Sequence, residues 1–417
     1  MAKADIAVID QPVEGFDADD LFFSRTDPRG VIQSCNSVFL RLSGYGRSEV
    51  IGAPHKIIRH PDMPRAVFSL MWQRLKAGAP FAGYVKNRAE DGRYYWVFAV
   101  AVEMGDSLVS VRLKPGSATL DKVAVIYRDL RKHELSADIT PKDSAARLQA
   151  MTVDLGFASY EEFAADALSS EMQHRQSALD RVPDSGLASY ADIAAALKRM
   201  DVAMANVVNL LRWIKGSPTN LAIQGGRLQK GAETLKVIAQ NYASLANEIE
   251  HVIGQLQSAM TGLRHTAQAG RLGYCARGLL SEAIPRFARE QAEQVAEHGQ
   301  IAADPAQEDR RMTIALGDFE QQMTESHKKV VAQNRRFSDV MANLKRVGSG
   351  LAMTRVMCRI EAAQIVGDAG GIHEIGEQLN RFQIDLGTEL DALLSDCKRI
   401  DGALTALGRR DTASLAA

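Results

Sequence analysis

Cysteine is scarce in this chain of 417 residues, which contains only Cys35, Cys275, Cys358 and Cys397. These cysteines lie far apart and form no Cys-X-X-Cys pair, which argues against a disulfide framework or a structural zinc site and fits a reducing compartment. No stretch approaches about 18 uninterrupted apolar residues, so the sequence predicts no membrane-spanning helix. The N-terminus carries Asp and Glu and does not resemble a signal peptide. We therefore expect a soluble cytoplasmic protein.

An excess of one charge is also missing, because the formal net charge is -1. The sequence contains no block of Lys and Arg, which removes the general electrostatic case for binding nucleic acid or an anionic membrane surface. The motifs of common enzymes are absent as well: there is no GxGxxG after a strand, no P-loop, no HExxH and no GxSxG. We therefore expect a protein that is not an enzyme and that does not bind nucleic acid.

The first third of the chain differs from the rest in its mixture of aromatic and β-branched runs with turn signals. Strands are predicted at 21–26, 31–33, 81–88, 93–103 and 108–113, and helices at 36–42 and 65–77. Two strands, short helices and three further antiparallel strands predict an α+β domain with a cupped five-stranded sheet over residues 20–115.

From about residue 118 onward the sequence is almost entirely helical. Residues 116–190 read as a helical connector, and residues 191–410 as a bundle of long helices. Two apolar stripes with residues three or four apart are typical of a coiled coil or bundle. The first is Leu235, Ile238, Tyr242, Leu245, Ile249, Ile253, Leu256, Met260 and Leu263, and the second is Ile372, Ile375, Leu379, Phe382, Leu386, Leu390, Leu393, Cys397 and Ile400.

The two stripes coincide when one is shifted by 137 residues, as from Leu235 to Ile372. The same shift places the segment 223–226 on 360–363, and both segments end in small residues. We interpret this match as an internal duplication that gives two diverged helical hairpins, at about 195–265 and 315–408. The alternative remains that any two heptad helices can be brought into register.

A polar corner separates the two predicted helices of the first domain. Two prolines and an acidic residue make Asp62 a candidate N-cap, with Pro64 in the first helical turn. Arg59, His60 and Asp62 would then lie on a rigid corner beside the cup. Arg59 offers fixed donors for a phosphate or a ring carbonyl, although His60 and Asp62 also suit purely structural roles as a loop partner and a cap.

Aromatic and amide side chains complete the candidate site. Trp72 and Trp96 would suit stacking on a planar aromatic cofactor, and Asn36 and Asn87 could supply the amide groups that recognise its polar edge. Each of these residues also suits the core of an empty domain. The combination, rather than any single residue, favours a binding site.

The first domain resembles the PAS domain of bacterial aerotaxis receptors over residues 20–115. The matching residues are Asn36, Phe39, Ser43-Gly44-Tyr45, Glu49, Ile51-Gly52, Pro54-His55, Arg59-His60-Pro61-Asp62-Met63-Pro64, Phe68, Met71-Trp72, Leu75-Lys76, Gly78, Gly83, Val85-Lys86-Asn87-Arg88, Gly92 and Tyr95-Trp96-Val97. The resemblance implies non-covalent binding of FAD and the sensing of redox state or oxygen. It implies the following cofactor-binding residues: Asn36, Arg59, His60, Asp62, Trp72 and Asn87.

Two other interpretations of this domain stay open. Some PAS domains hold haem, which needs an axial histidine, and the domain offers His55 and His60 at the helical corner. The domain could also bind no cofactor and act as an interaction or dimerisation scaffold.

The helical region resembles the hairpin tip of methyl-accepting chemotaxis proteins, on Ile360-Glu361-Ala362-Ala363, Gly367 and Gly370-Gly371-Ile372. This resemblance implies a protein partner such as a chemotaxis kinase or a coupling protein. It also implies a homo-oligomer, although two tandem hairpins could build the same four-helix bundle within one chain. The sequence thus predicts a redox or oxygen sensor that signals through a helical bundle.

Overall fold

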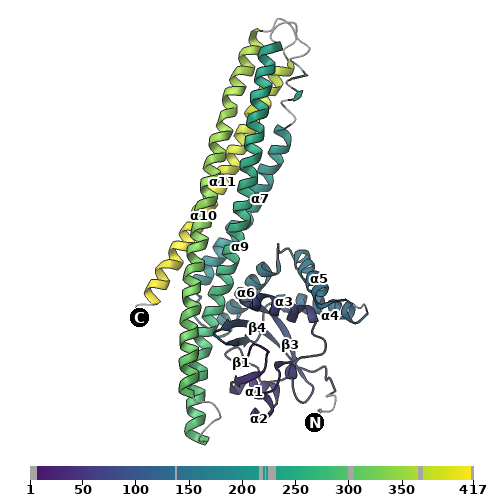
Figure 1. Cartoon of the computed structure of the whole chain (residues 1–417), viewed down its shortest axis with the longest axis vertical. Coiled ribbons are helices and arrows are strands. Elements are labelled where there is room, and N and C mark those ends of the chain that lie inside the picture. Colours follow the sequence, from purple (N-terminus) through teal and green to yellow (C-terminus); the bar gives the residue numbers. More distant parts are fainter. Residues whose placement is uncertain are drawn as a thin grey trace. The chain divides into compact units, whose positions relative to one another are not determined.

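The computed structural model describes residues 7–136, 139–215, 219–220, 222–223, 232–298, 305–364 and 370–414. The chain divides into two compact units. The first unit comprises the chain up to residue 187 together with residues 268–326, and the second comprises residues 188–267 together with residues from 327 onward. Figure 1 shows the strands and short helices of the first unit and the long helices of the second.

The predicted sheet is present, with all neighbouring strands antiparallel. Its strands are β1 (Leu21–Thr26), β2 (Ile32–Cys35), β3 (Phe81–Arg88), β4 (Tyr94–Met104) and β5 (Ser107–Leu113). The strand order is β2-β1-β5-β4-β3, so β5 lies at the centre. Strand β2 begins one residue later than predicted, because Val31 forms an isolated bridge with Pro54 instead of pairing with β1.

Short helices fill the connection between β2 and β3. They are α1 (Ser37–Ser43), α2 (Arg47–Val50), the 3-10 turn η1 (His55–Ile58) and α3 (Arg65–Lys76). The prediction that Asp62 caps α3 is wrong, since Pro64 occupies the N-cap and has no side-chain cap to offer. The first amides of α3 have no acceptor within the helix. The Glu134 carboxylate of another helix supplies one, accepting from the Arg65 amide at 2.9 Å and from the Ala66 amide at 3.1 Å.

The connector consists of α4 (Thr119–Ser136), α5 (Pro141–Asp154) and α6 (Tyr160–Ala178). Ser159 caps α6 as predicted, by accepting from the Glu162 amide. Helix α6 is fastened to the sheet by Glu171, which is fully buried. Its carboxylate accepts from the Tyr84 hydroxyl at 2.6 Å, the Ser117 hydroxyl at 2.5 Å and the Gly116 amide at 2.7 Å.

The second unit is built from long helices: α7 (Ser185–Ile214), α9 (Ala232–His298), α10 (Pro305–Gln364) and α11 (Gly370–Ser414). Helices α9 and α10 contribute residues to both units. Both predicted apolar stripes are buried, except that Leu245 is half-buried. Of the two segments matched in the predicted duplication, residues 224–226 lie outside the described residues, whereas residues 360–363 lie within α10; Gly367 is also outside the described residues. Within the described ranges, no helix combines the length and hydrophobicity needed to cross a bilayer.

Candidate functional site

A cavity of about 310 Å³ lies between α3 and the concave face of the sheet. Its helical wall is apolar and aromatic, with Phe68 and Trp72 one turn apart on α3 and Met71 just before Trp72. Because side chains alternate along a strand, the lining residues of β1, β3, β4 and β5 come from alternating positions. The strand residues that line it are Ser24, Thr26, Phe81, Val85, Asn87, Ala99, Ala101, Leu108, Ser110 and Arg112.

Three of the predicted cofactor residues meet at this cavity: Arg59, Trp72 and Asn87. The Arg59 guanidinium lies 3.7 Å from the centre of the Phe68 ring, and the Arg59 and Asn87 backbones form an isolated β-bridge. Asn87 is only 3% exposed, yet its Nδ2 has no hydrogen-bond partner among the described residues. Such an orphaned buried donor is rare in a folded protein, and a ligand acceptor would satisfy it.

A tight turn brings the hairpin between β1 and β2 against the same wall. Gly30 adopts a left-handed conformation with φ +82°, which a glycine accepts without strain. A Cβ atom at this position would lie 3.6 Å from the Trp72 ring, and the backbone of any residue with a side chain would be strained at this φ. The turn therefore allows the backbone to approach Trp72 where both line the cavity.

The other three predicted residues, Asn36, His60 and Asp62, are not among those that line the cavity. The Asn36 carboxamide oxygen caps α1 by accepting from the Phe39 amide and also accepts from the Phe23 amide, while its Nδ2 donates to the Leu21 carbonyl. Asn36 therefore joins α1 to β1, which is a structural role.

His60 and Asp62 form the corner that the sequence predicted, next to Arg59 but outside the cavity lining. Nδ1 of the buried His60 accepts from the Asp62 amide at 3.1 Å, and the Asp62 carboxylate pairs with Lys86 at 2.9 Å. Burial and the Lys86 charge lower the pKa of His60 to about 4, so its ring is neutral at pH 7. Trp96 packs near Tyr127, with ring centroids 6.2 Å apart, and does not line the cavity either.

The sequence interpretation missed a polar group on the sheet side of the cavity, formed by Ser24, His55 and Arg112. The Arg112 guanidinium donates to the Ser24 hydroxyl at 3.1 Å and lies 2.8 Å from His55 Nε2. Burial and the Arg112 charge hold the pKa of His55 well below its usual value. Antiparallel pairing of β1 with β5 brings Ser24 and Arg112 onto one face of the sheet, and η1 adds His55. The alternating polar residues Ser110 and Arg112 in an apolar strand were the available signal.

The cavity suits a planar aromatic ligand with a polar edge. Trp72 and Phe68 provide aromatic surface, Asn87 an unsatisfied donor, and Arg59 a planar guanidinium. A volume of about 310 Å³ lies at the lower end of the roughly 300–1,000 Å³ of ligand sites. The residues present therefore fit a ring system such as that of a flavin.

The opposite face of the sheet contacts α9 within the first unit. Phe23 of β1 stacks on Phe287 of α9, with ring centroids 4.4 Å apart and planes at 28°. Close by, the Ser37 amide and hydroxyl at the start of α1 donate to the Glu290 carboxylate at 2.6 and 3.0 Å. Ser24 lines the cavity, and the residue before it, Phe23, points to the opposite face of the sheet. Strand β1 therefore connects the cavity with α9.

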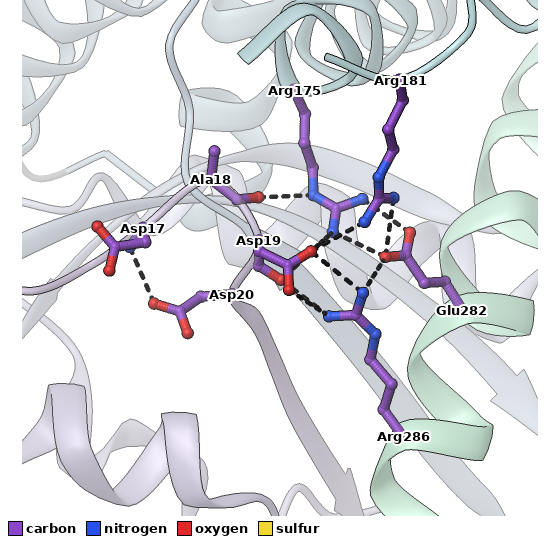
Figure 2. Close-up of polar contacts among 8 residues, drawn as sticks. All are labelled: Asp17, Ala18, Asp19, Asp20, Arg175, Arg181, Glu282 and Arg286. Atoms are coloured by element: carbon purple, nitrogen blue, oxygen red, sulfur yellow. Dashed lines mark hydrogen bonds and ion pairs between the residues drawn. The ribbon is translucent and has the colours of Figure 1, made fainter. Parts of the chain in front are cut away.

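An ionic cluster reinforces this contact, as Figure 2 shows. Asp19, just before β1, pairs with Arg286 of α9 at 3.1 Å and with Arg181 at 2.8 Å. Glu282 of α9 pairs with Arg175 of α6 at 2.7 Å and with Arg286 at 2.8 Å. The hydrogen bond from Arg286 lowers the pKa of Asp19. The cluster joins the entry to the sheet, the end of α6 and helix α9.

Comparison with known proteins agrees with this architecture. The family model described as "PAS fold" matches residues 32–108. The aerotaxis receptor of Escherichia coli strain K12 is 38% identical over 126 residues, which cover 29% of this chain and 25% of the receptor. The biofilm dispersion protein BdlA of Pseudomonas aeruginosa is 29% identical over 126 residues, 30% of this chain and 28% of that protein.

A solved structure, the light state of the blue-light photoreceptor Aureochrome1 LOV, covers 26% of this chain and 91% of that chain, with 24% identity and a TM-score of 0.23. The matched part spans about a quarter of the length of the curated relatives. Residues 32–108 therefore form a PAS domain, related in sequence to that part of the aerotaxis receptor, and the long helices follow it.

Proposed function

We propose that this chain is a non-enzymatic redox or oxygen sensor that binds FAD in the PAS cavity and signals through its helices to a protein partner. The observation that carries the proposal is the buried, unpartnered Nδ2 of Asn87 in a cavity walled by Trp72. The similarity to the aerotaxis receptor over 126 residues supports a sensory role.

A bound flavin would supply reversible electron transfer with changes of charge and protonation at the ring edge. Asn87 would donate its free N–H to an acceptor on that edge. Arg59, which lies over Phe68, would contribute a planar guanidinium near the same edge. Trp72 would cover a face of the ring.

The remaining predicted residues would act indirectly. Asn36 would keep α1 and β1 together through its three hydrogen bonds. His60 and Asp62 would fix the corner that carries Arg59, because Asp62 anchors to Lys86 on β3, next to Asn87.

The output would pass through the contact between β1 and α9. A change at the cavity that moves Ser24 would also move Phe23, since the two residues are consecutive in one strand. Phe23 contacts Phe287, and α9 continues into the second unit. For such a change to carry a signal, the two redox states must differ in their free energy of coupling to this contact.

We further propose the domain division predicted from the sequence, with a sensor at 20–115, a connector at 116–190 and a bundle at 191–410. The two hairpins of the bundle would form a four-helix arrangement within one chain, and its partner would be a chemotaxis kinase or a coupling protein. A pull-down with the purified full chain against these proteins tests the partner. A cytoplasmic location belongs to the same proposal.

Flavin binding is tested by titrating the purified full chain with FAD and following quenching of flavin fluorescence. We expect saturable binding in the wild type and a loss of affinity of about tenfold or more in Asn87→Ala and Trp72→Ala, as each removes a direct contact worth about 1.4 kcal/mol or more. Trp96→Phe, outside the cavity lining, is the matched control and should bind normally. A folded wild-type protein that does not bind FAD would exclude the flavin.

A second candidate, haem, is favoured by one observation: His55 lies in the cavity lining. Its Nε2 already contacts Arg112 and Ser24, so coordination would have to replace these contacts. A Soret band in the purified protein would select haem, whereas a colourless protein that binds neither cofactor would select the scaffold function.

A further inference from the structure

Arg112 lies in the central strand of the sheet and is almost completely buried, with 5% of its surface exposed. Its guanidinium contacts the Ser24 hydroxyl, the ring of His55 and, at 5.0 Å, the face of the Phe22 ring. These neighbours of the Arg112 guanidinium are a hydroxyl, a neutral imidazole and a benzene ring, and none of them carries a negative charge.

The cavity around Arg112 is also positively charged. Its lining includes Arg29, Lys56, Arg59 and Arg112, and no Asp or Glu is among the described residues that form it. Arg29 is paired with Asp27 at 3.1 Å and its side chain is 85% exposed, so solvent and a counter-ion compensate it. In the part of the chain that the structure describes, Arg112 has neither form of compensation.

Arg112 nevertheless keeps its charge. Burial lowers its pKa to about 10, which still leaves the guanidinium protonated at neutral pH. A buried charge without a partner costs a protein several kcal/mol of stability, and such a cost is typical of groups retained for binding rather than for folding.

We propose that Ser24, His55 and Arg112 form a subsite for a negatively charged, planar group of the ligand. Arg112 supplies the positive charge and the N–H donors that are not used by Ser24 and His55. Ser24 orients the guanidinium by accepting from one nitrogen, and the neutral His55 contacts another nitrogen of the same group. Only the identity of the ligand rests on the proposed function: the group is either the carbonyl-bearing edge of a flavin ring, which becomes anionic when the ring is reduced, or the carboxylate of a small acid.

The first test needs no ligand. In dialysed full-length protein, Arg112→Met removes the charge and keeps much of the volume. We expect a thermal midpoint equal to or above that of the wild type, with Arg93→Met, which removes an arginine paired with Asp91 outside the cavity, as the control for loss of a guanidinium. A midpoint lower than the wild type by more than about 4 °C would show that the guanidinium serves the fold, and would overturn the proposal.

The second test separates the two ligand sources by titration with FAD, riboflavin and citrate. Arg112→Met should lose about tenfold or more in affinity for the probe that the wild type binds, and Arg112→Lys should recover part of it, because an interaction with a charged donor contributes about 1.5–3 kcal/mol. A parallel loss for FAD and riboflavin assigns the flavin ring, and a loss for citrate alone assigns a carboxylate.

These outcomes distinguish the inference from the proposed function. If the wild type binds no flavin but loses citrate binding in Arg112→Met, the flavin proposal fails and the subsite stands. If the wild type binds flavin and Arg112→Met binds it equally well, the subsite is wrong and the flavin proposal stands. If the wild type binds none of the three probes, a midpoint of Arg112→Met no more than about 4 °C below that of the wild type supports the subsite, and a larger fall overturns it.

Discussion

Phe23 and Phe287 stack with ring centroids 4.4 Å apart, although one lies in the first strand of the sheet and the other near the end of α9. Both side chains are buried, with 1% and 3% of their surface exposed. Because Ser24, the next residue of β1, lines the cavity, this contact joins the cavity wall to α9. Mutagenesis can measure how much it contributes to stability.

Phe287→Ala should lower the free energy of unfolding by about 3–5 kcal/mol, the usual cost of deleting a buried phenylalanine. A double-mutant cycle with Phe23→Ala should give a coupling energy of about 1 kcal/mol, as expected for a stacked pair. Urea unfolding measures both quantities. Val182→Ala, at an 88% exposed position, should be additive with Phe23→Ala. Additivity of the two Phe substitutions would mean that the contact contributes no coupling.

The ionic cluster of Figure 2 should contribute less to the free energy of unfolding than the contact of Phe23 with Phe287. Its contribution should also depend on the salt concentration. Glu282→Gln should cost about 1–2 kcal/mol, less than the roughly 3–5 kcal/mol of a fully buried pair, because the Glu282 side chain is 23% exposed. The loss should shrink at high ionic strength, where charges are screened. Urea unfolding at low and high salt measures it, with the exposed Glu293→Gln on the same helix as the control. A loss independent of salt would contradict an electrostatic origin.

Glu134 should make stability depend on pH through its cap of α3. Burial raises the pKa of this carboxyl, but hydrogen bonds from Ser144 and from the Arg65 and Ala66 amides outweigh that effect and leave it below 4.5. The contribution is therefore present above the unfolded pKa of 4.5 and is lost as the pH falls through the folded value.

Glu134→Gln should accordingly flatten the decline in unfolding free energy between neutral and acid pH, measured by urea unfolding across that range. At neutral pH it should cost about 1–3 kcal/mol, the penalty for weakened bonds to buried donors. Asp154→Asn, at an exposed residue at the end of α5, should leave the pH profile unchanged. A Glu134→Gln profile parallel to that of the wild type would refute the cap.

Glu171 should fasten α6 to the sheet more strongly than its partners do individually. Glu171→Ala leaves the Tyr84 and Ser117 hydroxyls and the Gly116 amide without their acceptor, and should cost about 3 kcal/mol. Tyr84→Phe removes one donor and should cost about 1 kcal/mol. Thermal unfolding compares the two variants. Equal losses would indicate that the Tyr84 bond alone carries the attachment.

The strands and long helices could be predicted because local patterns determine them. The aromatic and β-branched runs bounded by turn signals predicted β1 at 21–26 and β3 at 81–88 with their observed bounds, and the a/d stripes of α9 and α11 are buried as their spacing predicted, apart from the half-buried Leu245. The start of α3 was harder to interpret. Asp62 is a residue type that often caps helices, but the group that accepts from the Arg65 amide is the Glu134 carboxylate. Glu134 lies in a helix that no local sequence pattern connects to Arg65.

The site could be predicted only in part for the same reason. Trp72 and Arg59 lie in or next to a recognisable helix, whereas Ser24 and Arg112 meet only through the register of β1 against β5. The contact of Ser37 with Glu290 joins residues 253 positions apart and left no signal in either segment. Contacts of this kind depend on tertiary packing, which a single sequence does not reveal.

If the redox state of a ligand in the cavity reaches α9, hydrogen–deuterium exchange of the full-length protein should detect it there. Exchange of residues 282–290 would be compared in the FAD-loaded protein before and after reduction, with Phe287→Ala as the uncoupled control. We expect a change in protection at 282–290 in the wild type that Phe287→Ala abolishes. Identical protection in both redox states, with the flavin demonstrably bound and reduced, would contradict it.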